Sequence, residues 1–382
     1  MLRFSYHELW RWDHVFRIIP LLLRRRHADR RAALELYDFF SMDRKPEKAE
    51  NHDVDWRSVA RSDCVAALKT LLITHESGLL HEMGPGHPEA PERLRAIQRG
   101  LEHARFASLS RMNAPEAQAE SLERVHPRAY LTALERAAPR EGYSALDSDT
   151  LMCPKTIEAV WRAAGGAVAA VDEVMSGRAD NAFVAVRPPG HHAGVHNPMG
   201  FCFVNNVAVA ARHALAAHGA ERVAIVDFDV HHGNGTQEIF WSDDKVLFCS
   251  THQAPFYPGT GGRNDTGDHD NIVNAPLLAG STGDAFGEAL ADRILPRVRD
   301  FAPDLILISA GFDAHERDPL GGLRLRETDF GDATKRLMDI ADRRCGGRIV
   351  SMLEGGYDVD ALSRSVNAHV LALMGVAEDG GV

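Results

Sequence analysis

The chain has 382 residues, of which 45% are hydrophobic, and a formal net charge of −11. The length suits one large α/β domain or two smaller ones, and the composition is ordinary for a globular protein. The negative charge argues against non-specific nucleic-acid binding, and no apolar run reaches the length of a membrane span. The five cysteines are scattered without a CxxC pair, which predicts a reducing, cytoplasmic compartment and no disulfide framework.

The first 66 residues differ from the rest, because they are rich in Arg, Trp and aliphatic residues and include a charged linker at 43–60. Glu8 and Asp13 precede the short apolar stretch and no small-residue cleavage site follows it, which argues against a signal peptide. A mitochondrial-type presequence is disfavoured by the same acidic residues. We expect residues 1–66 to be an accessory or poorly ordered extension and residues 67–382 to form the catalytic domain.

Strand and helix patterns alternate from residue 68 onward. Strands are predicted at 68–75, 182–186, 222–228, 246–251, 305–310 and 348–353. Helices are predicted from residue 91 and at 121–138, 155–176, 204–218, 283–299, 327–344 and 359–374. The Gly165–Gly166 pair inside one of these helices indicates close packing. Alternation of this kind is typical of a parallel sheet with helices on both faces.

The segment RVAIVDFDVHHGNGT, residues 222–236, joins a buried strand to a polar cluster. Val223–Val226 is a short run rich in β-branched residues, which suits a strand buried on both faces. Asp227, Asp229 and His231 then alternate, so that an extended backbone sends all three side chains to one side. Two carboxylates and an imidazole at a buried strand end are costly unless a cation binds there. Solvated strand-end residues are the plainer alternative.

Polar clusters follow four other predicted strands, at Arg187–His192, Thr251–His252, Phe312–His315 and Glu354–Asp358. The carboxyl ends of parallel strands lie along one edge of a sheet, so the topology should bring these clusters together. Asp313 then becomes the natural third metal ligand beside Asp229 and His231, although a helix cap or turn residue is the alternative. Such a set suits zinc with an open catalytic position, and iron or cobalt less exclusively.

His191 and His192 follow a rigid Pro-Pro-Gly turn, and near a metal we interpret them as acid–base groups. Each imidazole needs an acceptor on its other nitrogen, and Asp227 and Asn234 can supply two different ones. The aspartate favours imidazolium whereas the asparagine orients without charge, so the two histidines would be tuned apart. Tyr357 follows a Gly-Gly pair and could donate to a developing oxyanion, unless it is only a half-buried surface tyrosine.

These motifs together resemble the zinc-dependent histone deacetylase family, and most closely its class II-like members and the bacterial histone deacetylase-like amidohydrolases. The matching segments are GHPEAPERL, RPPGHHA, GFCFVNNVAVAA, VDFDVHHGNGTQ, FYPGTGG, SAGFDAHERDPLGGL and LEGGYD, and they span residues 70–375. The resemblance implies an arginase-like, three-layer α/β fold. Its central parallel sheet would have about eight strands, with helices on both faces.

The resemblance also implies roles for individual residues. It assigns one catalytic zinc ion to Asp229, His231 and Asp313. It makes His192 the general base and then the general acid, and Tyr357 the hydrogen-bond donor to the scissile carbonyl. Two further roles are implied: Asn234 would orient His192, and His191 would stay largely cationic beside Asp227.

The same resemblance also assigns residues that would bind the substrate and residues that would hold a structural ion. Asp149 would grip the substrate backbone at the rim, and Leu320 would line the channel mouth. Gly200 would form the floor of the acyl-lysine channel, with Phe201 and Tyr257 as its walls; Tyr257 departs from the Phe common at this position. A structural potassium ion is implied at Asp227, Asp229, His231, Ser250 and Thr251.

The predicted activity is zinc-dependent hydrolysis of N-acyl-lysine amides, which releases a carboxylate and a free amine. The expected substrate is an acyl-lysine protein or a small acylated amine, with no direct nucleic-acid or membrane partner. Hydrolysis of acetylpolyamines or other small amides uses the same chemistry and is an alternative. A non-catalytic acyl-lysine binding module would lack a ligand, base or tyrosine, and none is missing. A ureohydrolase would want two metals and more Asp and His ligands. The oligomeric state does not follow from the sequence.

Overall fold

The computed structural model describes residues 68–376, so the extension predicted for residues 1–66 lies outside the described part. Eight parallel strands form the central sheet in the order β2-β1-β5-β10-β9-β6-β7-β8, which confirms the predicted architecture. The strands are β1 (Thr70–Thr74), β2 (Ser110–Asn113), β5 (Asn181–Val184), β6 (Val223–Asp227), β7 (Val246–Gln253), β8 (Ile272–Leu277), β9 (Leu305–Ala310) and β10 (Ile349–Leu353). A separate short antiparallel pair consists of β3 (Ser144–Ala145) and β4 (Leu151–Met152).

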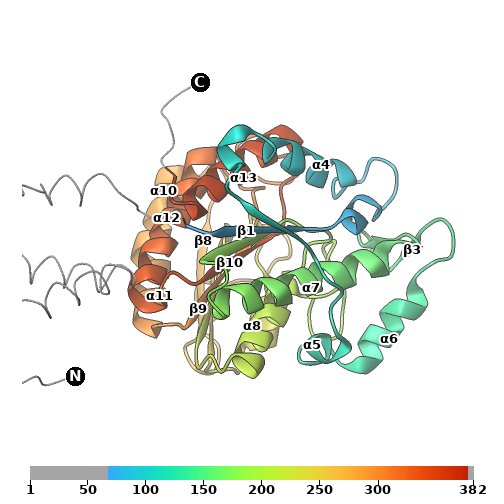
Figure 1. Ribbon diagram of the computed structural model, residues 1–382, viewed down its shortest axis with the longest axis horizontal. Helices are drawn as coiled ribbons and strands as arrows, with labels where there is room; N and C mark the ends of the chain where they lie inside the picture. Colours follow the sequence, from blue (N-terminus) through green and yellow to red (C-terminus); the bar gives the residue numbers. More distant parts are fainter. Residues whose placement is uncertain (1–67, 377–382) are drawn as a thin grey trace, which may run out of the picture. The chain divides into compact units, whose positions relative to one another are not determined.

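Helices cover both faces of this sheet (Figure 1). One face carries α7 (Thr156–Met175) and α8 (Asn206–Ala217), which contact β5 and β6 respectively, and α5 (Ala119–Glu123) packs on α8. The other face carries α12 (Glu327–Arg344) and α13 (Val359–Leu373), with α4 (Pro91–Gly100) against α13. The remaining helical segments are η1 (Glu76–Leu79), η2 (Ala104–Phe106), α6 (Arg128–Ala137), α9 (Asn234–Phe240), α10 (Gly283–Ala289), η3 (Leu290–Ile294) and α11 (Leu295–Phe301).

Strand β6 shows why the central strands are mostly apolar. All five of its residues are buried. Ala224 and Val226 belong to the core beneath α12 and α13, whereas Val223 and Ile225 belong to the core beneath α7 and α8. Successive side chains of a strand point to opposite faces, so a sheet covered on both sides favours apolar residues at successive positions. The strand ends at Asp227, and Asp229 and His231 lie in the loop that follows it.

Two helix predictions are wrong in their boundaries. The helix predicted at 121–138 is broken into α5 and α6 around Pro127, which has no N–H to continue an α-helix. The helix predicted at 283–299 contains the π-helical turn η3 just before Pro296, which again cannot donate within an α-helix. The edge strands β2 and β8 were not predicted; the first is largely polar and the second contains Pro276, which an edge strand tolerates.

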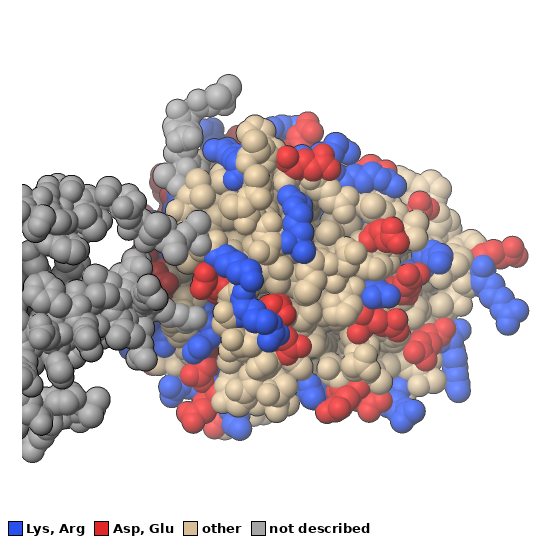
Figure 2. All heavy atoms as spheres, viewed as in Figure 1, with Lys and Arg blue, Asp and Glu red and all other residues tan. Residues whose placement is uncertain are grey.

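Three further features concern the surface, the helices and the cysteines of the described residues. The face in Figure 2 has Lys and Arg interspersed with Asp and Glu, without a large area of one sign. Within residues 68–376, no helix combines the length and the apolar character needed to cross a membrane. The four cysteines in this part of the chain, Cys153, Cys202, Cys249 and Cys345, are buried and free.

The glycine pair of α7 packs closely, as predicted. A Cβ atom on Gly165 would lie 2.0 Å from the Pro115 carbonyl oxygen, and one on Gly166 would lie 3.1 Å from Val184. The first distance is far below van der Waals contact with rigid backbone. Gly165 therefore lets α7 lie against the chain that follows β2.

We expect Gly165→Ala to destabilise the fold by about 1–3 kcal/mol, because overpacking outweighs the helix propensity that alanine gains. Gly287→Ala in α10 is the matched control, since its Cβ would meet nothing closer than 3.9 Å. Gly287→Ala should raise the free energy of unfolding by about 0.5–1 kcal/mol. Urea unfolding of both variants measures the difference, and equal stabilisation of the two would contradict the packing described for α7.

Candidate active site

Four neighbouring strands at the centre of the sheet carry the candidate site. β5, β10, β9 and β6 are adjacent in that order, and their C-terminal ends share one edge. The loops after them hold the chemistry-bearing side chains: His191 and His192 after β5, Tyr357 after β10, Asp313 after β9, and Asp229 and His231 after β6. Crossover connections thus place residues from distant parts of the chain at one location, where α/β sheets bind ligands.

Asp229, His231 and Asp313 form a compact buried group whose ligand atoms all lie within 4.8 Å of one another. His231 Nδ1 lies 3.1 Å from Asp229 Oδ1 and 3.2 Å from Asp313 Oδ2. Backbone N–H groups hold the carboxylates in place, since Gly355 donates to Asp229 Oδ2 and Val230 donates to Asp313 Oδ1, each at 2.8 Å. This geometry directs two carboxylates and one imidazole nitrogen to a common point.

The electrostatics of this group call for a cation. Burial, and then the negative charge of Asp229, raise the pKa of Asp313 to about 7. Two carboxylates with almost no solvent cannot both remain charged at low cost unless a positive charge lies between them. Carboxylate oxygens with an imidazole nitrogen are ligands that zinc takes, and three protein ligands leave a fourth position for water or substrate. The residues present therefore fit a catalytic zinc ion.

Two glycines allow the backbone to approach these ligands. A Cβ atom on Gly311 would lie 2.0 Å from Asp229 Oδ2, and one on Gly355 would lie 2.1 Å from Asp313 Oδ2. Neither position has room for a side chain. The glycines that follow β9 and β10 are thus required by the carboxylates rather than by turn geometry alone.

The tandem histidines have different partners and different charge. His191 Nδ1 lies 2.9 Å from Asp227 Oδ2, and His192 Nδ1 lies 2.7 Å from Asn234 Oδ1. Burial alone would lower the pKa of His191, but Asp227 and Asp229 raise it to about 10. Burial, and then the positive charge of His191, hold the pKa of His192 well below its usual range. One imidazole is therefore protonated near neutral pH and its neighbour, 4.0 Å away between ring centroids, is neutral.

Tyr357 lies between a cation and an aromatic ring. The Arg93 guanidinium sits 4.8 Å from the centre of the tyrosine ring, and Phe201 packs edge-on at 5.9 Å between centroids. Burial raises the pKa of the Tyr357 phenol well above its usual value, with Asp313 and Asp229 adding to this and Arg93 opposing it. The phenol therefore stays protonated and can donate a hydrogen bond.

Aromatic side chains surround the histidines at the position predicted for the channel. Tyr257 packs edge-on against His192 at 5.3 Å between ring centroids. Gly200 has φ +56°, and a Cβ atom there would lie 2.4 Å from His192 Cδ2. Phe201, whose φ is +70°, donates its N–H to Thr150 Oγ1. This loop is held in a left-handed conformation that only glycine adopts freely.

Asp149 lies in the same area. The Thr150 hydroxyl that accepts from Phe201 also donates to Asp149 Oδ1 at 3.1 Å. Burial, and then the charge of Asp149, raise the pKa of Tyr257 above its usual value. Asp149 is therefore close to both aromatic residues assigned to the channel walls.

Leu320 is partly buried, and the acidic residues beside it are engaged elsewhere. Asp318 is buried and accepts backbone N–H bonds from Leu320 at 2.9 Å, Tyr357 at 2.6 Å and Asp358 at 3.2 Å. Glu316 is exposed and pairs with Arg326 at 3.5 Å. Asp318 thus ties the loop after β9 to the loop after β10.

Sequence reasoning missed a buried ion cluster beneath the site. Glu89 binds Arg93 Nη1 at 2.9 Å and Arg187 Nη2 at 2.6 Å. Burial would raise the pKa of Glu89, but the two guanidinium groups lower it to about 2. Arg93 also donates to the carbonyl oxygens of Gly356 and Glu354. All members lie within matched motifs, but nothing in a sequence distinguishes a buried Arg from an exposed one.

Two more supporting residues were not assigned from the sequence. Glu354 is buried, and its Oε2 accepts the N–H groups of Gly190 at 2.7 Å and His191 at 3.1 Å. Burial raises the pKa of Glu354 to about 7. Phe256 stacks on the His231 ring at 5.4 Å between centroids. The position of Glu354 directly after a strand is the only signal that pointed to it.

The residues suggested for a structural potassium ion adjoin the metal group. The β6–β7 register places Asp227 opposite Ser250. The Ser250 hydroxyl is bonded to His252 Nδ1, whereas Thr251 Oγ1 is buried and has no hydrogen-bond partner. An oxygen left unpaired in this way is compatible with a ligand for a hard cation.

The parallel sheet brings the buried carboxylate–imidazole group and a neutral histidine together in an arrangement suited to metal-assisted hydrolysis. The Histone deacetylase domain family model matches residues 87–373. A histone deacetylase-like amidohydrolase of Pseudomonas aeruginosa is 43% identical over 277 residues, which cover 71% of this chain and 73% of that protein. A probable deacetylase of Archaeoglobus fulgidus is 39% identical over 311 residues, covering 80% and 86% respectively.

A solved structure agrees with these matches. The crystal structure of the HDA15 HD domain superposes with a TM-score of 0.77 at 39% identity, covering 83% of this chain and 91% of that one. The chain belongs to the histone deacetylase family, and it is a deacetylase or amidohydrolase of that family.

Asp318→Asn tests whether the carboxylate between the two loops positions Tyr357. An amide oxygen can replace one acceptor, but its NH2 group would face backbone N–H donors, at a cost of about 1–3 kcal/mol. We expect faster hydrogen exchange at residues 355–358 and a lower kcat, with the fold retained. Asp360→Asn is the control, because Asp360 is 75% exposed and pairs only loosely with Arg317 at 3.8 Å. Equal hydrogen exchange at residues 355–358 in Asp318→Asn and Asp360→Asn would show that Asp318 does not position Tyr357.

Proposed function

We propose that this protein is a zinc-dependent hydrolase of N-acyl-lysine side chains in proteins, which releases a carboxylate and a free lysine amine. The observation that carries the proposal is the buried Asp229–His231–Asp313 group with neutral His192 beside it. The rings of His192 and His231 lie 5.9 Å apart between centroids. Family membership and the names of the relatives support the reaction class.

Zinc would be held by Asp229, His231 and Asp313, and when bound it would polarise the acyl carbonyl and acidify a water molecule. Two carboxylate ligands donate more negative charge than a three-histidine set, so a neighbouring base is required. His192 fits this role, because Asn234 Oδ1 accepts from its Nδ1–H and thus leaves Nε2 unprotonated. His192 then takes the proton of the attacking water and later returns it to the leaving lysine amine.

Two other groups stabilise the charge that develops. Tyr357, kept protonated by its buried setting, donates a hydrogen bond to the oxyanion. His191 is held cationic by Asp227, so it lowers the basicity of His192 and adds positive charge next to the reaction. The two imidazoles thereby divide their tasks, one as a proton carrier and one as a fixed charge.

The substrate residues suit an acyl-lysine side chain. Phe201 and Tyr257 would flank the lysine methylenes, with Gly200 at the floor, and Asp149 would accept from the substrate backbone at the rim. Leu320 would present an apolar surface at the mouth. Hydrolysis of acetylpolyamines is the second candidate, since the chemistry is the same. Engagement of Asp318 with three backbone N–H groups favours the lysine substrate, because this carboxylate near Leu320 is already bonded and is not free to bind a second amine.

A potassium ion held by Asp227, Asp229, His231, Ser250 and Thr251 would be structural in this proposal. The unpartnered Thr251 oxygen supports it. A reducing, cytoplasmic location also remains a prediction, supported by the free buried cysteines of the described residues.

Removal of the metal tests the proposal directly. We expect protein stripped with a strong chelator to lose deacetylation of acetyl-lysine peptides and to regain it with one equivalent of Zn²⁺, because carbonyl polarisation requires the ion. Peptide turnover and zinc content are measured on the same samples. Full turnover by metal-free protein would refute zinc dependence.

His192→Ala provides the matched control for that experiment. This variant keeps all three zinc ligands, so it should bind zinc normally while its kcat falls by about 10²–10⁴-fold. Tyr357→Phe should likewise keep zinc, and its kcat should fall by about 10²–10³-fold. Loss of zinc in either variant would mean that the substitution acts through the metal site instead.

Leu320→Glu tests the substrate class. A carboxylate at the channel mouth would attract the second amine of a polyamine, and partly buried opposite charges gain up to a few kcal/mol. We therefore expect wild-type protein to prefer acetyl-lysine peptides over N-acetylspermidine, and the variant to shift toward the polyamine. Leu320→Gln, which has nearly the same shape without the charge, is the control. A wild-type preference in kcat/KM for the polyamine would overturn the assignment.

A further inference from the structure

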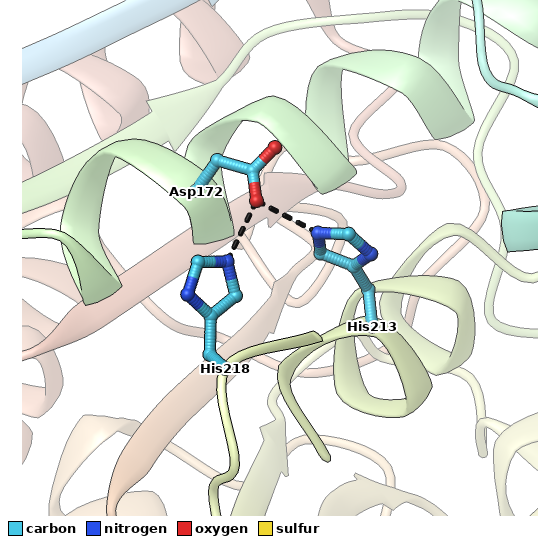
Figure 3. A group of neighbouring side chains, drawn as sticks. All are labelled: Asp172, His213 and His218. Atoms are coloured by element: carbon cyan, nitrogen blue, oxygen red, sulfur yellow. Dashed lines mark hydrogen bonds and ion pairs between the residues drawn. The ribbon is translucent and has the colours of Figure 1, made fainter. Parts of the chain in front are cut away.

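A second group of metal-ligand side chains lies on the helices that cover one face of the sheet. Asp172 is in the last turn of α7, His213 is near the end of α8, and His218 caps α8. Both imidazole Nε2 atoms point at the same carboxylate oxygen, Asp172 Oδ1, at 2.8 Å from His213 and 2.7 Å from His218 (Figure 3). The three ligand atoms lie within 4.8 Å of one another.

The group is separate from the candidate active site. Helix α7 leads into β5 and helix α8 leads into β6, so the C-terminal ends of both helices lie where these strands begin. The catalytic residues follow the ends of the same strands. The two groups are therefore at opposite edges of the sheet, and the second one takes no part in the reaction proposed above.

The electrostatic setting suits a cation. The C-terminal ends of two helices meet here, and each carries a partial negative charge on its free carbonyl groups. Burial would raise the pKa of Asp172, but the hydrogen bonds from His213 and His218 lower it, so the carboxylate is ionised. Asp172 is 42% exposed and His218 is 22% exposed, which leaves access for an ion and for water ligands.

The positively charged side chain of Arg124 opposes binding of a cation by Asp172, His213 and His218. It follows α5, and its Nη1 donates to His213 Nδ1 at 3.0 Å while its Nη2 binds Glu120 at 2.8 Å. A guanidinium can only donate, so His213 Nδ1 must be an acceptor and the Nε2–H donates to Asp172. A metal on Nε2 would move this proton to Nδ1, where it would face Arg124.

We propose that Asp172, His213 and His218 form a second divalent metal site, of the zinc, nickel or cobalt type, which ties α7 to α8 and whose affinity Arg124 sets. Two imidazoles and a carboxylate are a ligand set for these ions, with water completing the coordination. Two ligand atoms that each lie 2.0–2.2 Å from a zinc ion are roughly 3.3 Å apart. The distances from Asp172 Oδ1 to the two Nε2 atoms therefore need to lengthen by only about 0.5 Å. For His213, binding requires the change of tautomer described above.

Calorimetric titration of the full chain with Zn²⁺ alone, after the catalytic site has been filled, tests this site. We expect one further equivalent to bind to the wild type. Asp172→Asn and His218→Asn should each weaken that step by at least about tenfold, as loss of one ligand in a small site does. Glu158→Gln, which changes a carboxylate at the other end of α7, is the matched control and should bind as wild type does. Absence of a second equivalent, or an unchanged second step in Asp172→Asn, would overturn the proposal.

Arg124→Gln is the variant that distinguishes a built site from a loose surface contact. Its side-chain oxygen can accept from the His213 Nδ1–H that metal binding requires, so the second Zn²⁺ should bind several-fold more tightly than in the wild type. Bound Zn²⁺ should also raise the thermal unfolding midpoint of wild type and Arg124→Gln but not of Asp172→Asn, because the ion stabilises only the folded state. Weaker binding in Arg124→Gln would contradict the proposal. Deacetylation by the zinc-loaded variants should stay at the wild-type rate.

Discussion

Burial of negative charge at one edge of the sheet is the constraint on which the rest of the structure depends. Asp227, Asp229 and Asp313 are fully buried, and Glu354 lies next to them. Carboxylates without solvent must be neutralised, hydrogen-bonded or bound to a cation. Backbone N–H groups, the cationic His191 and a bound metal ion meet this requirement together. The glycines after β9 and β10 follow from it, since any side chain there would displace a carboxylate.

A second layer of charge holds the loops that carry these groups. Glu89 is shared by Arg93 and Arg187, and Arg93 reaches the carbonyl oxygens on either side of Gly355. Removing one member of a buried ion group leaves an uncompensated charge, which costs about 3–5 kcal/mol. Tyr357 is therefore held by two contacts from outside its loop: Arg93 of the ion cluster lies over its ring and binds the Gly356 carbonyl, and Asp318 accepts its backbone N–H.

The sequence predicted those features that arise from short, strong patterns. The strands buried on both faces, such as β6 and β9, are continuous apolar runs, and the parallel order collected the polar strand ends at one edge. The need of each imidazole for an acceptor pointed to Asp227 and Asn234, and the resemblance to the deacetylase family assigned Asp227 to His191 and Asn234 to His192, as the hydrogen bonds have it. The helix breaks near Pro127 and Pro296 were missed although the prolines that cause them are visible in the sequence, and the edge strand β2 was missed because its residues are largely polar. The partners of Glu89 depend on tertiary burial, which no spacing reveals.

The strand order has a consequence for how this protein is made. Strand β10 is the last to leave the ribosome, yet it lies in the middle of the sheet between β5 and β9. Asp229 and His231 are synthesised some eighty residues before Asp313, and Tyr357 comes later still. Until β10 is inserted, the nascent chain holds two half-sheets with open edges, β2-β1-β5 and β9-β6-β7-β8, and only the second carries the metal ligands. Insertion of β10 thus joins the half-sheet that carries the metal ligands to the one that carries His191 and His192, and it brings Tyr357 with it. The active site is therefore complete only after synthesis of almost the whole chain.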